Sequence, residues 1–262
     1  MATGGVGKKV KIWTINNGKI DRTSTKVEEF TTEQASTYSL SFNRQGLLAT
    51  VGNDEAVTIH HQVANLIADR KILQPARGNR EVQGLAFSPN GRLLATVSAD
   101  QQLRLWDLAG SQVARFPVSG ENVNTIAFSP NGELIATGAE DGTIELRDPQ
   151  GNFLDRVLLE KLQHSPIASL VFEPKGQRLA AIAKSGGVEW LVIENKAFKK
   201  TNEIPVVESW QAPIQQIKSL AFAPNLRQVA VLQTHGTVSI WDRPSNQFLF
   251  SLPSRHTPRV NP

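Results

Sequence analysis

The stretch SPNGRLLATVSADQQLRLWD, residues 88–107, has the pattern of a turn, a strand, a second turn and a second strand. Ser-Pro-Asn-Gly favours a tight turn, because proline fixes φ and glycine accepts a left-handed conformation. Residues 93–97 form an apolar, β-branched run of strand length. Further on, Leu103 and Leu105 alternate with Arg104, which indicates another strand that ends at a Trp-Asp dipeptide. The stretch therefore predicts half of a four-stranded unit.

The same pattern recurs along nearly the whole chain. Each turn is preceded by an apolar segment that ends in phenylalanine, and these phenylalanines lie 41 to 50 residues apart. They are Phe42, Phe87, Phe128, Phe172 and Phe222. Each unit holds about four short strands, which fits a propeller blade better than a sandwich, because a sandwich does not repeat its sequence.

These repeats resemble those of WD-repeat β-propellers. The resemblance rests on the period, on two SPNG turns and on the dipeptides Trp106-Asp107 and Trp241-Asp242. Residues 128–154 are similar in phrasing to bacterial multi-repeat WD proteins. The resemblance implies an all-β WD-repeat propeller with five complete four-stranded blades and an N-terminal partial blade, arranged as an incomplete or a six-bladed ring.

We expect one propeller domain over residues 1–262, beginning inside a repeat because the strand that would precede Ala2 is missing. The expected segments are a partial blade at 1–30, blades at about 31–75, 76–117, 118–161, 162–209 and 210–253, and a tail at 254–262. Three arrangements are open: an open arc, a six-bladed ring with one defective blade, or a ring completed by another chain. Unpaired blade edges also favour self-association.

The resemblance further implies a hydrogen-bond network inside each blade, made by a Ser or Thr of the second strand, an Asp of the next turn and the Trp of the third strand. The expected members are Thr96, Asp100 and Trp106 in one blade, Thr50 with Asp54, Thr137 with Asp141, and Trp241 alone. His60 and Arg147 occupy positions where the tryptophan would stand. We expect most blades to depend on apolar packing, because a partly satisfied buried network is destabilising.

Composition argues against several other classes of protein. The chain has no cysteine, which excludes a disulfide framework and cysteine-ligated metals. Its net charge of +4 comes from residues spread along the chain, a pattern that favours solubility over nucleic-acid binding. No apolar run is long enough to cross a membrane. We therefore expect a cytoplasmic protein without nucleic-acid or membrane partners.

Motifs for catalysis or cofactor binding are incomplete. Residues 3–9, TGGVGKK, resemble the end of a phosphate-binding loop but lack its first glycine and its final Ser or Thr. His60 and His61 point to opposite faces of a strand and cannot bind one ion together. The chain has no G-x-S-x-G nucleophile elbow. We therefore expect no enzyme activity, no metal and no cofactor.

Partner contacts are expected in the loops between the repeats. In a propeller, the links between blades and the turns before each Trp-Asp strand gather on one face. The candidate contacts there are Arg80, Glu121, Asn122, Glu140 and Trp210. Trp210 either packs beneath its loop or stands exposed as an anchor. These features predict a protein-protein interaction scaffold; the alternative, a regulatory or sensor segment of a larger signalling NTPase, rests on the resemblance alone.

Overall fold

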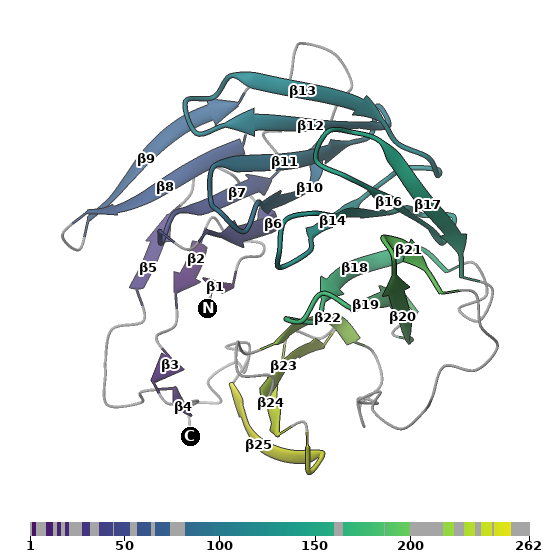
Figure 1. The fold of residues 1–262 in the computed structure, drawn as a ribbon. Helices are drawn as coiled ribbons and strands as arrows, with labels where there is room; N and C mark the ends of the chain where they lie inside the picture. The colour runs from purple at the N-terminus through teal and green to yellow at the C-terminus, as the bar shows by residue number, and fades with distance from the viewer. Residues whose placement is uncertain are drawn as a thin grey trace, which may run out of the picture.

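The structure is a computed structural model, and its described residues form strands, turns and loops (Figure 1). The described residues are 2–3, 9–12, 15–16, 19–20, 28–31, 37–43, 45–52, 57–63, 66–73, 82–159, 165–185, 187–199, 217–222, 228–233, 237–242 and 244–252. The predicted Asp54, Arg80 and Trp210 lie outside these residues, so the structure places none of them.

Five four-stranded antiparallel sheets follow one another along the chain, each with its strands in sequence order. The first two are β6 (Thr37–Phe42), β7 (Leu48–Gly52), β8 (Val57–Val63) and β9 (Leu66–Leu73), then β10 (Val82–Phe87), β11 (Leu93–Ser98), β12 (Gln102–Asp107) and β13 (Gln112–Pro117). The others are β14 (Thr125–Phe128), β15 (Ile135–Gly138), β16 (Thr143–Arg147) and β17 (Phe153–Leu158); β18 (Ile167–Phe172), β19 (Arg178–Ala183), β20 (Val188–Glu194) and β21 (Ala197–Phe198); and β22 (Ile217–Phe222), β23 (Gln228–Gln233), β24 (Val238–Asp242) and β25 (Gln247–Leu252). The prediction of five four-stranded blades is confirmed.

A three-stranded sheet occupies the place of the predicted partial blade. Its strands are β1 (Ala2–Thr3), β2 (Lys9–Ile12) and β5 (Glu28–Thr31), in that order. A separate hairpin is formed by β3 (Ile15–Asn16) and β4 (Lys19–Ile20). Within the described part of the chain no strand lies beyond β1, so this sheet has one strand fewer than the five blades.

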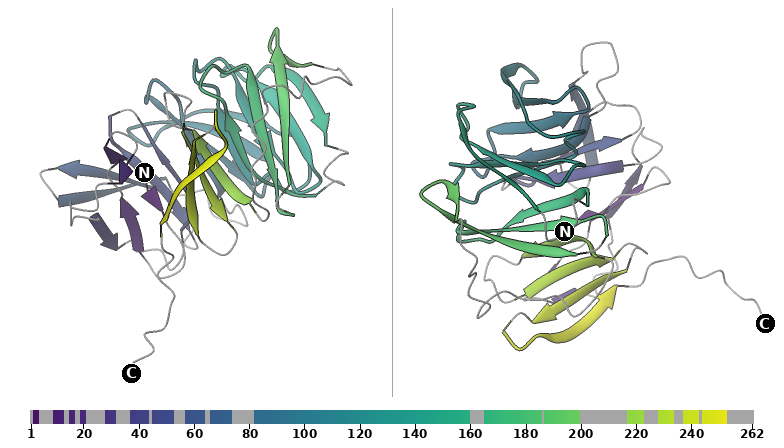
Figure 2. Two further views of the ribbon diagram at one scale, coloured as in Figure 1. Left: turned by 90° about the horizontal axis from the view of Figure 1, so that it is seen from below. Right: turned by 90° about the vertical axis from the view of Figure 1, so that its right-hand side faces the viewer.

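The sheets stand around a common axis, each beside its sequence neighbour (Figures 1 and 2). The first strands of successive blades, β6, β10, β14, β18 and β22, contact one another in that order. Between the first two, the hydroxyls of Ser39 and Ser41 accept hydrogen bonds from the backbone N–H groups of Leu85 and Phe87, at 3.4 and 3.1 Å. Backbone donors on the first strand of one blade are therefore satisfied by side chains of the blade before it.

The hydrophobic core lies between blades. On β12, Leu103 and Leu105 are fully buried and pack in one cluster with Val123, Ile126 and Ile135 of the next blade. Second strands such as β7 are buried along their whole length, because a neighbouring blade covers each face. Burial of one such leucine contributes about 1.5–3 kcal/mol. Inter-blade packing of several such side chains therefore stabilises the fold.

Both SPNG turns have the same internal structure. In the first, Ser88 Oγ accepts from the N–H of Leu93 at 3.0 Å and bonds Asn90 Oδ1 at 2.7 Å. Gly91 takes a φ of 69°, in the left-handed region that glycine tolerates best. Gln45 from the preceding blade donates from its Nε2 to the carbonyl of Asn90 at 3.3 Å. We call this end of the blades the turn face and define it by residues 45–47, 88–92 and 129–133. Turns of neighbouring blades contact each other there, as Gln45 and Asn90 do.

Candidate functional site

The links between blades and the turns before each third strand gather at the opposite end of the strands. We call this end the loop face and define it by residues 99–101, 118–122, 139–142, 165–166 and 184–185. Backbone hydrogen bonds join its parts: Val118 N–H to the Gln101 carbonyl at 3.0 Å, and Glu140 N–H to the Glu121 carbonyl at 2.8 Å. The loop face is opposite the turn face because β11 has residues 88–92 at one end and residues 99–101 at the other.

Glu140 links three segments of the loop face. Its Oε2 accepts from Asn122 Nδ2 at 3.2 Å, and its Oε1 accepts from Lys184 Nζ of the next blade at 2.8 Å. The hydrogen bond from Lys184, followed by that from Asn122, holds the pKa of Glu140 below its ordinary value, although burial opposes this shift. The Lys184 and Glu140 side chains remain 52% and 40% exposed. A partner could therefore reach these groups, which are already oriented by one another.

Asp141 supports the same surface through the backbone. One of its carboxylate oxygens accepts from the N–H of Thr143 at 2.8 Å, and the other accepts from the N–H of Glu121 at 3.3 Å. Asn122 has a φ of 50°, an uncommon conformation for a residue other than glycine. Both Glu121 and Asn122 are exposed. Of the predicted partner contacts, the structure brings Glu121, Asn122 and Glu140 together.

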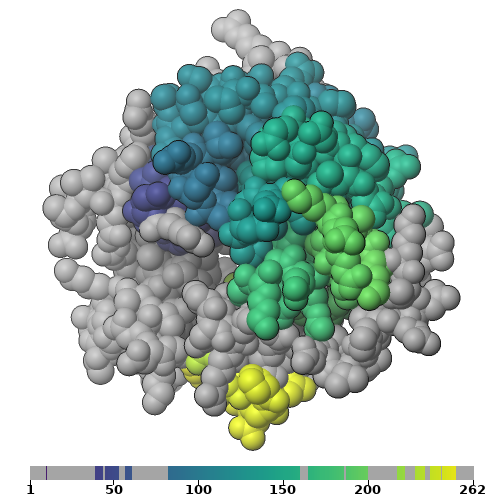
Figure 3. All heavy atoms as spheres, viewed as in Figure 1, coloured from purple at the N-terminus to yellow at the C-terminus, as the bar shows by residue number. Residues whose placement is uncertain are grey.

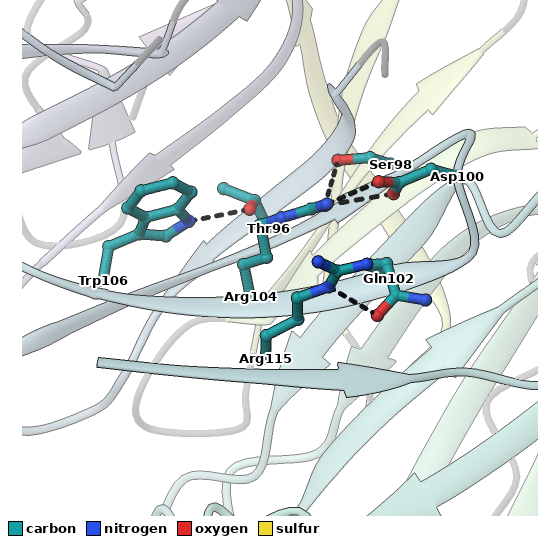
Figure 4. Close-up of polar contacts among 7 residues, drawn as sticks. All are labelled: Thr96, Ser98, Asp100, Gln102, Arg104, Trp106 and Arg115. Atoms are coloured by element: carbon teal, nitrogen blue, oxygen red, sulfur yellow. Dashed lines mark hydrogen bonds and ion pairs between the residues drawn. The ribbon is translucent and has the colours of Figure 1, made fainter. Parts of the chain in front are cut away.

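Inside the blade that contains residues 88–107, the predicted network members Thr96, Asp100 and Trp106 lie on β11, on the turn after it and on β12 (Figure 4). Trp106 Nε1 donates to Thr96 Oγ1 at 2.9 Å. Asp100, however, forms an ion pair with Arg104, whose Nη1 lies 3.0 Å from Asp100 Oδ1. Arg104 is only 5% exposed and also reaches Ser98 Oγ at 3.4 Å. Arg104 was not among the predicted network members, although its position two residues before the tryptophan places it on the same face of β12.

In the blade β6–β9, a histidine makes the contact that a tryptophan makes in the blade β10–β13. His60 is buried, and its Nε2 lies 2.8 Å from Thr50 Oγ1. Both pairs join residues ten positions apart, Thr50 with His60 and Thr96 with Trp106. From the sequence, His60 was expected only to stand in the position of the tryptophan. An imidazole can replace an indole here because each carries a ring nitrogen able to bond a hydroxyl.

The blade β14–β17 uses a third arrangement. Arg147 occupies the tryptophan position, but it pairs with Glu145 and donates from Nη1 to the Gly151 carbonyl at 2.8 Å. Glu145 is 1% exposed and accepts from the N–H of Ser119 at 3.0 Å. This carboxylate, which the sequence analysis also missed, therefore anchors the link that carries Glu121. In the last blade, Trp241 Nε1 donates to Ser239 Oγ at 2.9 Å.

Within the described ranges, no group of three or more His, Asp or Glu side chains could hold a metal ion. The same residues include no helix long and apolar enough to cross a membrane.

Comparison with known proteins identifies the repeats. Residues 71–107 and 110–148 match the model of the WD40 family, described as "WD domain, G-beta repeat". Over 116 residues the chain is 30% identical to the anaphase-promoting complex subunit cdh1 of Dictyostelium discoideum, which corresponds to 43% of this chain and 14% of that protein's length.

The fold also resembles that of a chain in a crystal structure of the mitotic checkpoint complex. The match has a TM-score of 0.67 at 21% identity and covers 92% of this chain and 72% of that chain. At this identity the likeness concerns the fold alone. These observations show that the chain is a β-propeller, two repeats of which, at 71–107 and 110–148, match the WD40 model.

Proposed function

We propose that the chain is a non-catalytic scaffold that binds other proteins through its loop face. The observation that supports this proposal best is the arrangement around Glu140, where segments from neighbouring blades present exposed polar side chains in one place. Rigid strands hold these segments at both ends. A platform of this kind recognises a partner through side chains on loops and needs no chemistry of its own.

Preorganisation favours binding at this surface. Asp141 fixes the backbone of the link at Glu121, and Glu145 fixes it at Ser119. Because the backbone is held before a partner arrives, less conformational entropy is lost on association. We propose that Arg80 and Trp210 extend the same surface, since the propeller pattern assigns their segments to this face.

The charge of the loop face favours proteins over nucleic acid as partners. Its described acidic side chains include Glu121, Glu140 and Asp141, and its exposed basic side chain among the described residues is Lys184. Nucleic-acid binding depends on neutralising phosphates with lysine and arginine, which this surface does not offer in excess. By their names, the similar proteins belong to protein complexes, which fits the same proposal.

We also propose that self-association can occur at unpaired blade edges, beginning with the inner edge of β1. The alternative function, a regulatory segment of a larger signalling NTPase, stays a prediction based on resemblance.

The test of the scaffold proposal is peptide selection followed by a comparison of the two faces. Peptides selected on the wild-type chain from a phage-displayed library would be titrated against the double variant Glu121→Arg/Asn122→Arg by fluorescence anisotropy. We expect affinity to fall by at least about tenfold, because both exposed contacts are replaced by long cations. The matched control is Arg92→Glu, an exposed charge on the turn face. Equal loss in both variants, or loss in the control alone, would contradict the proposal.

A further inference from the structure

The outermost strand of the last blade, β25, presents an exposed edge. Among the described strands it pairs with β24 alone. Phe248 and Leu249 are 52% and 42% exposed, and Ser251 is exposed as well. In the space-filling view the last described segment of the chain, drawn in yellow, lies at the margin of the molecule (Figure 3). Among the described residues, no strand pairs with the outer edge of β25.

The sequence of β25 differs from those of the other outer strands. Proteins protect such strands with charged residues or proline, because an open edge otherwise pairs with other chains. In sequence, the other outer strands contain charged residues or proline: Glu28 and Glu29 in β5, Asp69, Arg70 and Lys71 in β9, Arg115 and Pro117 in β13, and Asp155 and Arg156 in β17. The strand β21 is only two residues long. By contrast β25, QFLFSL, has neither charge nor proline and contains two phenylalanines.

Packing beneath β25 holds the strand in an extended form. The ring of Phe248 meets the ring of Trp241 edge to face, with centroids 5.5 Å apart. Phe250 is half-buried against the cluster of Val238 and Ile240. The register of β24 and β25 is interrupted at Leu249 by an irregularity that β13 and β17 share, so this irregularity does not distinguish β25. The difference therefore lies in the side chains of the edge.

We propose that β25 pairs antiparallel with β25 of a second copy of this chain, related by a two-fold axis. Self-pairing suits this strand because an uncharged sequence meets its own copy without repulsion between like charges. An axis between Leu249 and Phe250 places each of these residues opposite the other one in the second copy. The two blades then form one continuous sheet of eight strands. This inference is independent of the loop-face proposal, since β25 lies on the outer rim.

The test is the mass of the chain in solution, measured by light scattering after size-exclusion chromatography at about 1 to 100 µM. We expect the wild type to reach twice its 28.7 kDa as concentration rises. Leu249→Lys and Ser251→Lys each place a charge on the edge that a second strand would cover, and each should weaken dimerisation at least about tenfold. The second variant removes no apolar contact, so it separates edge charge from packing.

Val113→Lys is the matched control. Val113 is 53% exposed and occupies the corresponding irregularity of β13, which is already protected by Arg115 and Pro117. It should leave the dimer unchanged, with circular dichroism confirming that all variants are folded. A wild type that remains monomeric throughout, a Ser251→Lys dimer of wild-type strength, or an equal loss in Val113→Lys would each overturn the proposal. None of these results bears on peptide binding at the loop face.

Discussion

The blades β6–β9 and β10–β13 make the same internal contact with different side chains. In one, Thr50 bonds a buried histidine, and in the other, Thr96 bonds a tryptophan. The position across the two middle strands is kept, whereas the aromatic group changes. A repeat can therefore lose its signature residue and still satisfy the buried hydroxyl. The blade β14–β17 shows the limit of this tolerance, because Arg147 turns to Glu145 instead of to Thr137.

The largest expected effect is the loss of stability when Trp106 or His60 is removed, and the two losses should differ. Trp106→Ala should destabilise the fold by about 3–4 kcal/mol and His60→Ala by about 2 kcal/mol, because the indole removes more packed volume. Equilibrium unfolding in urea measures both. If His60→Ala were the more harmful change, the view of histidine as a smaller substitute would fail.

The next largest loss of stability is expected for changes at Glu145 in the blade β14–β17. Glu145→Ala should cost about 3 kcal/mol, because it removes the anionic partner of the partly buried Arg147 cation and the acceptor of the Ser119 N–H. Glu145→Gln keeps an acceptor and should cost less. Urea unfolding of the two variants gives the values, and indistinguishable midpoints would indicate that the charge contributes nothing.

Isosteric changes isolate the hydroxyl itself. Thr96→Val and Thr50→Val should each destabilise by about 1–2 kcal/mol, because each removes the hydroxyl that bonds the ring nitrogen of Trp106 or His60. Thr137→Val is the control at the equivalent position, and it should change stability by less than about 0.5 kcal/mol. Thermal and urea unfolding of the three variants tests the series; a loss at Thr137 as large as at Thr96 would refute it.

The smallest effect concerns the exposed Glu140. Its pKa in the folded state lies below the ordinary value of 4.5, so its contribution is present above that value and is lost as the pH falls through the folded pKa. At neutral pH Glu140→Gln should lower stability by less than about 1 kcal/mol, because the Lys184 pair is exposed. Melting curves from pH 7 to pH 3 should converge for the two proteins. A gap that widens towards low pH would contradict this assignment.

The blades were predictable because their signals are local. Turns such as SPNG and apolar runs of strand length repeat with a period that only a blade array explains, and the five four-stranded sheets followed from them. The side-chain pairs were not predictable in the same way. The bond between Thr50 and His60 depends on a strand register that places them diagonally across β7 and β8, and the Glu140 bonds depend on loops from different blades. The ion pairs of Arg104 and Glu145 did have a sequence signal, because each of these two is a charged residue on a middle strand.

The serine hydroxyls that join β6 to β10 have a consequence for how such an array grows. Ser39 and Ser41 bond backbone N–H groups, which every blade offers whatever its sequence. A duplicated unit of 41 to 50 residues would therefore meet a neighbour that already fits it. For these two contacts a duplicated blade would need only its backbone, whereas the apolar packing between blades would still depend on its side chains.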